Sequence, residues 1–202
     1  MQEEKGKCIV VDGSSLFAMG IANGIGGIRQ FELYGALTEL GKSTVLSRIP
    51  AYITSARASL GLRNAISHAG FDLLVETTEG SADDKAVRNI IQEQNPDKTA
   101  EIILVSADIK DYLSILLEKS EAGIEIYIVA TKATGHDDHP MVSPQVMYLF
   151  QEESKFHFIE IGEYKSRIMY REAEEGFSTR GIQRYNFLFE FPNNEPRFRS
   201  KT

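Results

Sequence analysis

Aspartates follow two of the apolar runs in this chain. Asp12 ends the run at residues 8–11, and Asp108 lies two positions beyond the run at residues 101–106. Carboxylate oxygens are the ligands that hard divalent cations such as Mg²⁺ and Mn²⁺ prefer. A cation held by convergent aspartates can polarise a phosphodiester, generate hydroxide from water and stabilise the leaving oxygen. The spacing therefore favours metal-assisted chemistry on a phosphate ester.

Three further aspartates belong to the same candidate cluster. Asp111 lies three residues after Asp108, while Asp83 and Asp84 open a helical segment with apolar positions between residues 86 and 91. We favour Asp84 over Asp83 as a ligand because the core-facing positions lie at helical spacing from it. The alternative for either residue of this pair is a favourable interaction with the positive end of the helix.

Asp12 also has an alternative role as a helix cap. Gly13 permits a sharp exit from the strand, and Ser14 or Ser15 can cap the helix that follows. Asp12 itself is a residue type that caps helices well. On this stretch alone, the capping role and the catalytic role carry equal weight.

Apolar runs alternate with amphipathic segments across residues 8–130. The first run is β-branched with no polar alternation, which is typical of a strand covered on both faces of a parallel sheet. The alternation predicts an α/β fold: a three-layer α/β/α sandwich with a mainly parallel, Rossmann-like central sheet. Ligands bind outside the carboxyl ends of the strands in such sheets, where Asp12 and Asp108 would lie. The predicted strands are residues 8–11, 51–54, 71–76, 101–106, 125–130 and 156–161.

Helical spacing is clearest in two segments. Residues 30–46 place Phe31, Tyr34, Leu37 and Leu40 on one side, and residues 60–69 form an amphipathic helix with Leu60 on its apolar face, closed by Gly70. Further helices are predicted within residues 79–92, 112–123 and 143–150.

Composition narrows the class of protein. The chain has 202 residues, 42% of them hydrophobic, which is enough for one core. Its one cysteine, Cys8, lies inside an apolar run, so no intramolecular disulfide can form and a reducing compartment is favoured. The N-terminus has no apolar segment after its charges and no run is long enough to span a membrane, so we expect a cytoplasmic protein with no membrane partner.

The net charge of −7 argues against a dedicated, passive nucleic-acid binder. It does not exclude a nuclease, because a bound divalent metal largely offsets an acidic cluster. Beyond Gly176 the chain is locally basic, and we expect removal of residues 178–202 to weaken RNA binding. A second copy of the chain or a protein partner is the other candidate source of substrate affinity.

The loop from His136 to His139 is a weaker metal candidate. It contains two histidines and two aspartates, but their spacing matches no structural zinc pattern. A solvated loop is the favoured interpretation.

Three motifs together resemble the NYN domains of the PIN-like nuclease superfamily. They are Val-Asp-Gly-Ser-Ser-Leu-Phe at residues 11–17, Asp-Asp-Lys at 83–85 and Ser-Ala-Asp-Ile-Lys-Asp-Tyr at 106–112. Their order and separation also agree with that family. The resemblance implies a PIN-like domain over residues 1–162, followed by a partly basic and aromatic extension over residues 163–202.

The resemblance also implies a function and its residues. It implies a metal-dependent endoribonuclease that uses Mg²⁺ or Mn²⁺, with Asp12, Asp84, Asp108 and Asp111 as ligands and catalytic residues, and Asp83 as the neighbouring metal candidate. Ser106 would orient its loop. Either Lys85 or Lys110 would hold a phosphate of the substrate.

This chain departs from the family pattern at two positions. Ser15 stands where the family usually has asparagine, so this shorter side chain would reach the metal only through water. Two residues separate Asp108 from Asp111, where the commoner pattern has one, which moves Asp111 around the start of the helix.

The predicted reaction is hydrolysis of RNA by metal-activated water, with no covalent intermediate. Cys8 lies in an apolar run and is not expected to act as a nucleophile. One alternative is a catalytically silent NYN-like domain that binds RNA or serves as a scaffold. A small-molecule phosphohydrolase ranks last, because the Asp-x-Asp of haloacid-dehalogenase-type enzymes is absent at Asp12-Gly13-Ser14.

Overall fold

The computed structural model describes residues 4–25, 27–76, 82–135 and 139–169. Within these ranges the strands are β1 (Gly6–Asp12), β2 (Ala51–Ser55), β3 (Asp72–Glu76), β4 (Thr99–Val105), β5 (Glu125–Ala130) and β6 (Phe156–Glu160). The α-helices are α1 (Gly13–Ala22), α2 (Gln30–Glu39), α3 (Leu60–His68), α4 (Ala82–Gln92), α5 (Leu113–Glu121), α6 (Pro144–Glu152) and α7 (Lys165–Ile168). Two 3-10 helices, η1 (Ile109–Asp111) and η2 (Ile161–Tyr164), complete the described elements.

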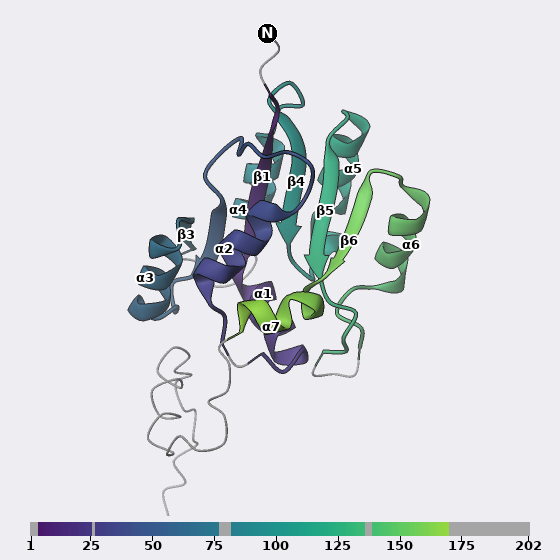
Figure 1. Cartoon of the computed structure of the whole chain (residues 1–202). Coiled ribbons are helices and arrows are strands. Elements are labelled where there is room, and N and C mark those ends of the chain that lie inside the picture. Colours follow the sequence, from purple (N-terminus) through teal and green to yellow (C-terminus); the bar gives the residue numbers. More distant parts are fainter. Residues whose placement is uncertain (1–3, 26, 77–81, 136–138, 170–202) are drawn as a thin grey trace, which may run out of the picture.

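The strands form a single sheet in the order β3-β2-β1-β4-β5-β6, and each described pair of neighbours is parallel. This is the strand order of the doubly wound Rossmann fold, whose topological switch point lies between β1 and β4. The predicted α/β/α sandwich is therefore confirmed. In Figure 1 the carboxyl ends of the strands point downward, and we call that side of the sheet the carboxyl edge.

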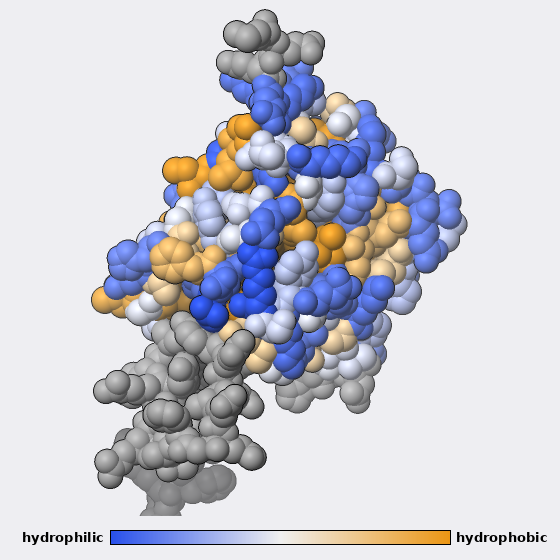
Figure 2. Space-filling view, in the orientation of Figure 1, coloured by the Kyte–Doolittle hydropathy of each residue, from blue (hydrophilic) through white to orange (hydrophobic). Residues whose placement is uncertain are grey.

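Helices cover both faces of the sheet. In Figure 1, α2 and α7 lie in front of the strands, whereas α4 and α5 lie behind them. The chain moves outward from β1 through β2 to β3 and then returns across the sheet to β4, so right-handed crossovers put the two groups of helices on opposite faces. Figure 2 shows hydrophilic residues over much of the visible face, with hydrophobic residues gathered in smaller groups.

Strand β1 is the centre of the core. All seven of its residues are buried, as expected for a central strand covered on both faces. Cys8 is completely buried, and this burial raises the pKa of its thiol to about 12. The thiol is therefore neutral at physiological pH, in agreement with its predicted lack of nucleophilic character.

Two predicted helices differ from those in the structure. The α2 helix ends at Glu39, seven residues before the predicted end, and Gly41 follows with a positive φ of 78°. Its buried face is formed by Leu33, Ala36 and Leu37, whereas Phe31 is 66% exposed. Leu60 is 73% exposed at the start of α3. Both predicted inward positions were wrong because the residues lie off the buried faces, which run through Gln30, Leu33 and Leu37 in α2 and contain Ile66 in α3.

A buried lysine anchors the loop after α2 to the sheet. It does so at the amino ends of the strands, which we call the amino edge. Lys7 of β1 is 1% exposed, and its Nζ donates to the carbonyls of Thr38, at 2.9 Å, and Leu40. An ammonium group at this position satisfies the last carbonyls of α2 and interacts favourably with the helix dipole. Burial is the main cause that lowers the pKa of Lys7, and the nearby Glu101 carboxylate opposes it.

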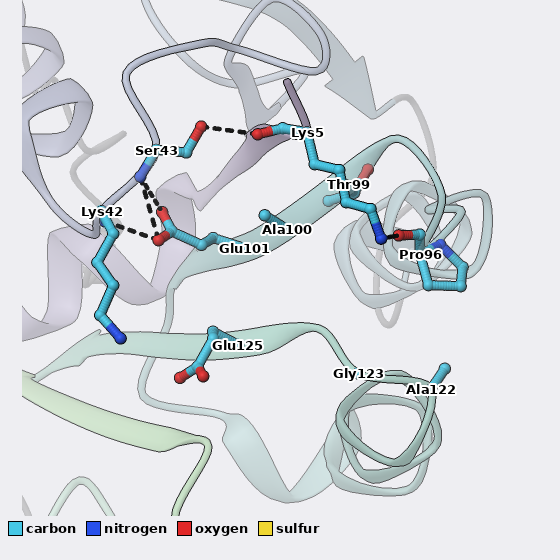
Figure 3. A pocket seen from close by; sticks show the side chains of 10 residues that line it. All are labelled: Lys5, Lys42, Ser43, Pro96, Thr99, Ala100, Glu101, Ala122, Gly123 and Glu125. Carbon is cyan, nitrogen blue, oxygen red and sulfur yellow. Dashed lines mark hydrogen bonds between the residues drawn. The ribbon is translucent and has the colours of Figure 1, made fainter. Parts of the chain in front are cut away.

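Glu101 of β4 anchors the same loop from the neighbouring strand. Its buried Oε1 accepts from the backbone N–H groups of Lys42, at 2.6 Å, and Ser43, at 3.2 Å (Figure 3). A side chain at Gly41 would collide with this carboxylate, so the close approach requires glycine as well as the positive φ. The side chains of Lys42 and Glu125 line a groove of about 520 Å³ in front of this anchor.

The last described elements pack on the body beyond the predicted domain boundary at residue 162. The α7 helix lies beside α2, and Arg167 forms two hydrogen bonds to the Glu39 carboxylate at 2.6 and 3.0 Å. Met169 forms an antiparallel bridge with Ile28. The described body thus extends through residue 169. Within its ranges, no helix has the length and apolar character needed to cross a membrane.

Candidate functional site

Asp12 lies at the junction of β1 and α1, beside the switch point of the sheet. Its Oδ1 accepts from the backbone N–H of Ser15 at 3.0 Å, so Asp12 is the N-cap of α1. The predicted capping role is confirmed, and Asp12 takes it instead of Ser14 or Ser15. A Cβ at Gly13 would lie 2.5 Å from the carbonyl oxygen of Ile53, so only glycine lets the turn pass this close to β2.

Ser106 joins Asp12 to the turn that follows β4. Its hydroxyl donates to Oδ2 of Asp12 at 3.0 Å and accepts from the backbone N–H of Asp108 at 3.1 Å. Ser106 is completely buried, and its own N–H donates to the carbonyl of Val129 at the end of β5. One hydroxyl therefore links the Asp12 carboxylate to the backbone of Asp108 in the turn after β4. The predicted role of Ser106 in orienting this loop agrees with these contacts.

Ser15 holds the same turn through a second hydrogen bond. Its Oγ accepts from the backbone N–H of Ala107 at 2.5 Å, and the residue is 3% exposed. Ser15 and Ser106 thus hold two consecutive backbone N–H groups of the turn. Their described contacts are those of positioning groups, whereas direct contact with a substrate stays a prediction for both.

An aromatic side chain packs against the turn that carries Asp12: a Cβ at Gly13 would lie 2.6 Å from the ring of Tyr52. Tyr52 of β2 is 4% exposed, and its pKa is raised chiefly by burial and further by the Asp12 carboxylate, while a hydrogen bond with Gln30 opposes the change. The phenol is therefore neutral over the physiological range. Asp12 itself is 3% exposed.

The turn after β4 presents charged residues at the surface. Asp108 and Lys110 are exposed, and Asp111 is half-buried at the end of η1. The carbonyl of Asp111 accepts a hydrogen bond from the guanidinium of Arg88 on α4. Sequence reasoning missed Arg88; its only signal was a basic residue four positions after the predicted Asp84 ligand.

The α4 helix, which carries the motif at residues 83–85, packs as predicted. Val87, Ile90 and Ile91 of α4 are 0 to 5% exposed and contact the core, and Lys85 is exposed. Asp83 and Asp84 lie in the first turn of the α4 backbone, but their side chains lie outside the described part of the molecule. Their ligand role therefore stays a prediction.

The side chains at the carboxyl edge fit a magnesium-type ion in the chemistry of their donor atoms. Asp12 and Asp108 offer hard oxygen donors from neighbouring strand ends joined through Ser106. Mg²⁺ commonly uses one or two carboxylates and keeps several waters. Among the described side chains, no group of three or more histidine, cysteine or acidic residues could hold a metal. A site here would need water, substrate oxygens or further side chains to complete it.

Two other segments that the sequence suggested for metal or RNA binding lie mostly outside the described residues. His139 is exposed at the edge of its loop, and residues 136–138 lie outside the described ranges. The basic and aromatic extension beyond residue 169 also lies outside the described ranges.

Comparisons with known proteins show no established relative. No protein-family model and no curated protein matches the chain. A crystal structure of a protein of unknown function from Vibrio parahaemolyticus is similar over 80% of this chain and 98% of its own, at 14% identity and a TM-score of 0.49.

Proposed function

We propose that this protein is a metal-dependent endoribonuclease with its site at the carboxyl edge of the sheet. The observation that carries the proposal is the Ser106 hydroxyl, which bonds both the Asp12 carboxylate and the backbone N–H of Asp108. This contact joins two acid-bearing turns at the switch point, where ligands of doubly wound sheets bind. The resemblance of residues 11–17, 83–85 and 106–112 to the NYN motifs supplies the nuclease assignment.

Each residue has a proposed role. Asp12 and Asp108, with Asp84 and Asp111, would hold Mg²⁺ or Mn²⁺, which when bound would activate water and stabilise the leaving oxygen. Lys110, exposed between two of these acids, would contact a phosphate of the RNA. Ser15 and Ser106 would keep the turn after β4 in position, because together they hold the N–H groups of residues 107 and 108.

The test is cleavage of a mixed pool of single-stranded and structured RNA. The wild type would be assayed with Mn²⁺, with Mg²⁺ and with a chelator, beside Asp12→Asn and Asp108→Asn. Asp97→Asn is the matched control, since Asp97 is an exposed aspartate before β4, at the opposite edge. We expect metal-dependent cleavage that falls about 1,000-fold or more in the two site variants, as loss of several kcal/mol of transition-state stabilisation implies.

Folded site variants that cleave at the wild-type rate would disprove the residue assignment. Circular dichroism and thermal melting of each variant would establish that it is folded. Cleavage that survives the chelator would disprove the dependence on metal.

A catalytically silent RNA-binding or scaffold domain is the second candidate. The capping role of Asp12 and its exposure of 3% favour this alternative, because a carboxylate used in this way has a structural function without any metal. The discriminating measurement is the melting temperature with added Mn²⁺. A silent domain would show no rise, whereas a metal site raises the melting temperature with the logarithm of the metal concentration once that concentration exceeds Kd.

A further inference from the structure

An open groove of about 350 Å³ lies beside α6, at the same edge of the sheet as Asp12. Its lining includes Lys132, Val142, Pro144, Met147 and Tyr148, and we call it the α6 groove. Lys132 is the second residue after β5, whose carboxyl end is at the bottom of the sheet in Figure 1. The Lys132 end of the groove therefore lies at the carboxyl edge, and the lining contains none of the candidate site residues.

The distance between the groove and the candidate site suits a polymeric ligand. Strand β4 separates β1 from β5, and adjacent strands lie about 4.8 Å apart, so the ends of β1 and β5 are separated by about 10 Å. Successive stacked nucleotides advance by about 3.4 Å along a strand. A chain crossing Asp12 would therefore pass the ends of β4 and β5 in about three nucleotides, and Lys132, two residues beyond β5, begins the lining of the groove.

The groove offers an apolar floor and an exposed aromatic ring. Val142 is 3% exposed and Met147 packs against the core, while Tyr148 is 59% exposed on α6. A large aromatic side chain left in water beside apolar residues can stack with a flat ring. Nucleobases have such a face, and unstacked bases of single-stranded RNA bind to aromatic side chains in this way.

Among the described residues that line the groove, one side chain, that of Lys132, carries a positive charge. The exposed Lys132 has its Nζ 5.3 Å from the centroid of the Phe158 ring. A lysine beside an aromatic groove can contact the phosphate next to a stacked base. Because the chain has a net charge of −7, general electrostatic attraction cannot supply much affinity for RNA. Stacking supplies affinity without requiring a basic surface.

We propose that the α6 groove binds an unstacked nucleobase of single-stranded RNA, with Tyr148 against the base and Lys132 beside its phosphate. The inference rests on the proposed function, since it gives the RNA a path from Asp12 across the ends of β4 and β5. It also narrows the substrate to single strands, because the bases of a duplex remain stacked and paired.

The experiment measures binding of a fluorescently labelled twelve-nucleotide RNA to the full chain in chelator, where metal-dependent cleavage cannot occur. We expect Tyr148→Ala to weaken binding about tenfold or more, and Tyr148→Phe to bind within about twofold of wild type. Phe31→Ala is the matched control, because Phe31 is a similarly exposed aromatic residue on α2, outside the groove. Lys132→Ala should reduce the slope of log affinity against log salt by about one.

An abasic chain of the same length and a duplex of the same sequence complete the experiment. Wild type should bind both more weakly than the RNA, and Tyr148→Ala should lose most of that preference. Equal binding by Tyr148→Ala and Phe31→Ala would overturn the proposal, as would equal binding of RNA and abasic chain to the wild type. No binding by the wild type would also overturn it and would leave the groove to a protein partner.

The result is separable from the test of hydrolysis. If Tyr148→Ala loses binding and no form of the protein cleaves RNA, the stacking site stands and the nuclease proposal fails. If the wild type cleaves RNA and Tyr148→Ala does so with unchanged KM, the nuclease proposal stands and the stacking site fails.

Discussion

The two edges of the sheet each bury a carboxylate that accepts backbone N–H groups, yet the two carboxylates are connected differently. At the amino edge, Glu101 is 2% exposed and binds the loop after α2, with the buried Lys7 nearby. At the carboxyl edge, Asp12 is 3% exposed and caps α1. Burial and hydrogen bonding alone do not distinguish the structural carboxylate from the candidate catalytic one.

The groups next to each carboxylate do distinguish them. The contacts of Glu101 end in the loop at Lys42 and Ser43, which the carboxylate fastens to the sheet. The contacts of Asp12 continue through the Ser106 hydroxyl to Asp108, which is exposed. Glu101 also reaches the surface, because Lys42 is exposed beside a groove, but that exposed side chain is basic. The comparison teaches that a candidate cation site is indicated by a connection from a buried acid to a second, exposed acid.

Replacing the amino-edge carboxylate should have the largest effect on stability. Glu101→Gln removes charge-assisted hydrogen bonds and the negative charge beside buried Lys7, so we expect the free energy of unfolding to fall by roughly 2–4 kcal/mol. Asp12→Asn retains an acceptor for the Ser15 N–H and should cost about 1 kcal/mol or less. Urea unfolding of both variants makes the measurement.

The loss of unfolding free energy in Glu101→Gln should depend on pH, because Lys7 titrates beside Glu101. Burial lowers the pKa of Lys7, so the unfolded chain binds more protons than the folded chain at alkaline pH, and stability rises with pH there. Without Glu101 the pKa falls further. The difference in free energy of unfolding between wild type and Glu101→Gln should therefore narrow as the pH rises toward 10.5, the ordinary pKa of lysine. A difference that widens would show that Lys7 is not the cause.

Ser106→Ala should affect both stability and activity at the carboxyl edge. It leaves buried Asp12 and the Asp108 N–H without this shared partner, which should cost about 1–3 kcal/mol. Loss of a residue that orients metal ligands typically reduces activity about 10- to 100-fold. Ser15→Ala, the matched loss of a buried hydroxyl, should cost similar stability with a smaller loss of activity. Equal losses of activity in Ser106→Ala and Ser15→Ala would contradict a role of Ser106 in orienting the metal ligands.

Arg88→Ala should have a smaller effect, centred on the turn that carries Asp111. The variant loses the hydrogen bond between α4 and the Asp111 carbonyl, at a cost of roughly 0.5–1.5 kcal/mol. If this bond positions the candidate site, the rise in melting temperature caused by Mn²⁺ should shrink. Arg63→Ala, which loses a similar bond to the Ala56 carbonyl, should leave that rise unchanged. The same rise in both variants would make Arg88 purely structural.

The exposed ion pair between Glu39 and Arg167 should have the smallest effect. Its hydrogen bonds with Arg167 lower the pKa of Glu39 below the ordinary value of 4.5. The stabilisation is therefore present above that value and lost as the pH falls through the lowered pKa. Glu39→Gln should reduce the melting temperature slightly at neutral pH in low salt, and not at strongly acidic pH or in high salt. A reduction that persists in acid would contradict the electrostatic origin.

The sequence by itself determined the architecture and the position of the candidate site. The unbroken apolar runs at residues 8–11 and 102–105 predicted buried parallel strands, because strands covered on both faces lack polar alternation. Aspartates within three residues of their ends were therefore expected at the carboxyl edge. The apolar positions of α4 were also predicted correctly, since helical periodicity is a local property of the chain.

Only the tertiary structure decided what each polar group contacts. Ser106 and Asp12 are 94 residues apart, and Lys7 and Leu40 are 33 apart, so no local pattern indicates that they are bonded. Phe31 and Leu60 matched an apolar face by spacing but remained exposed, because burial depends on whether another element covers that side of the helix. Periodicity is encoded along the chain, whereas hydrogen-bond partners and burial arise when distant segments pack together.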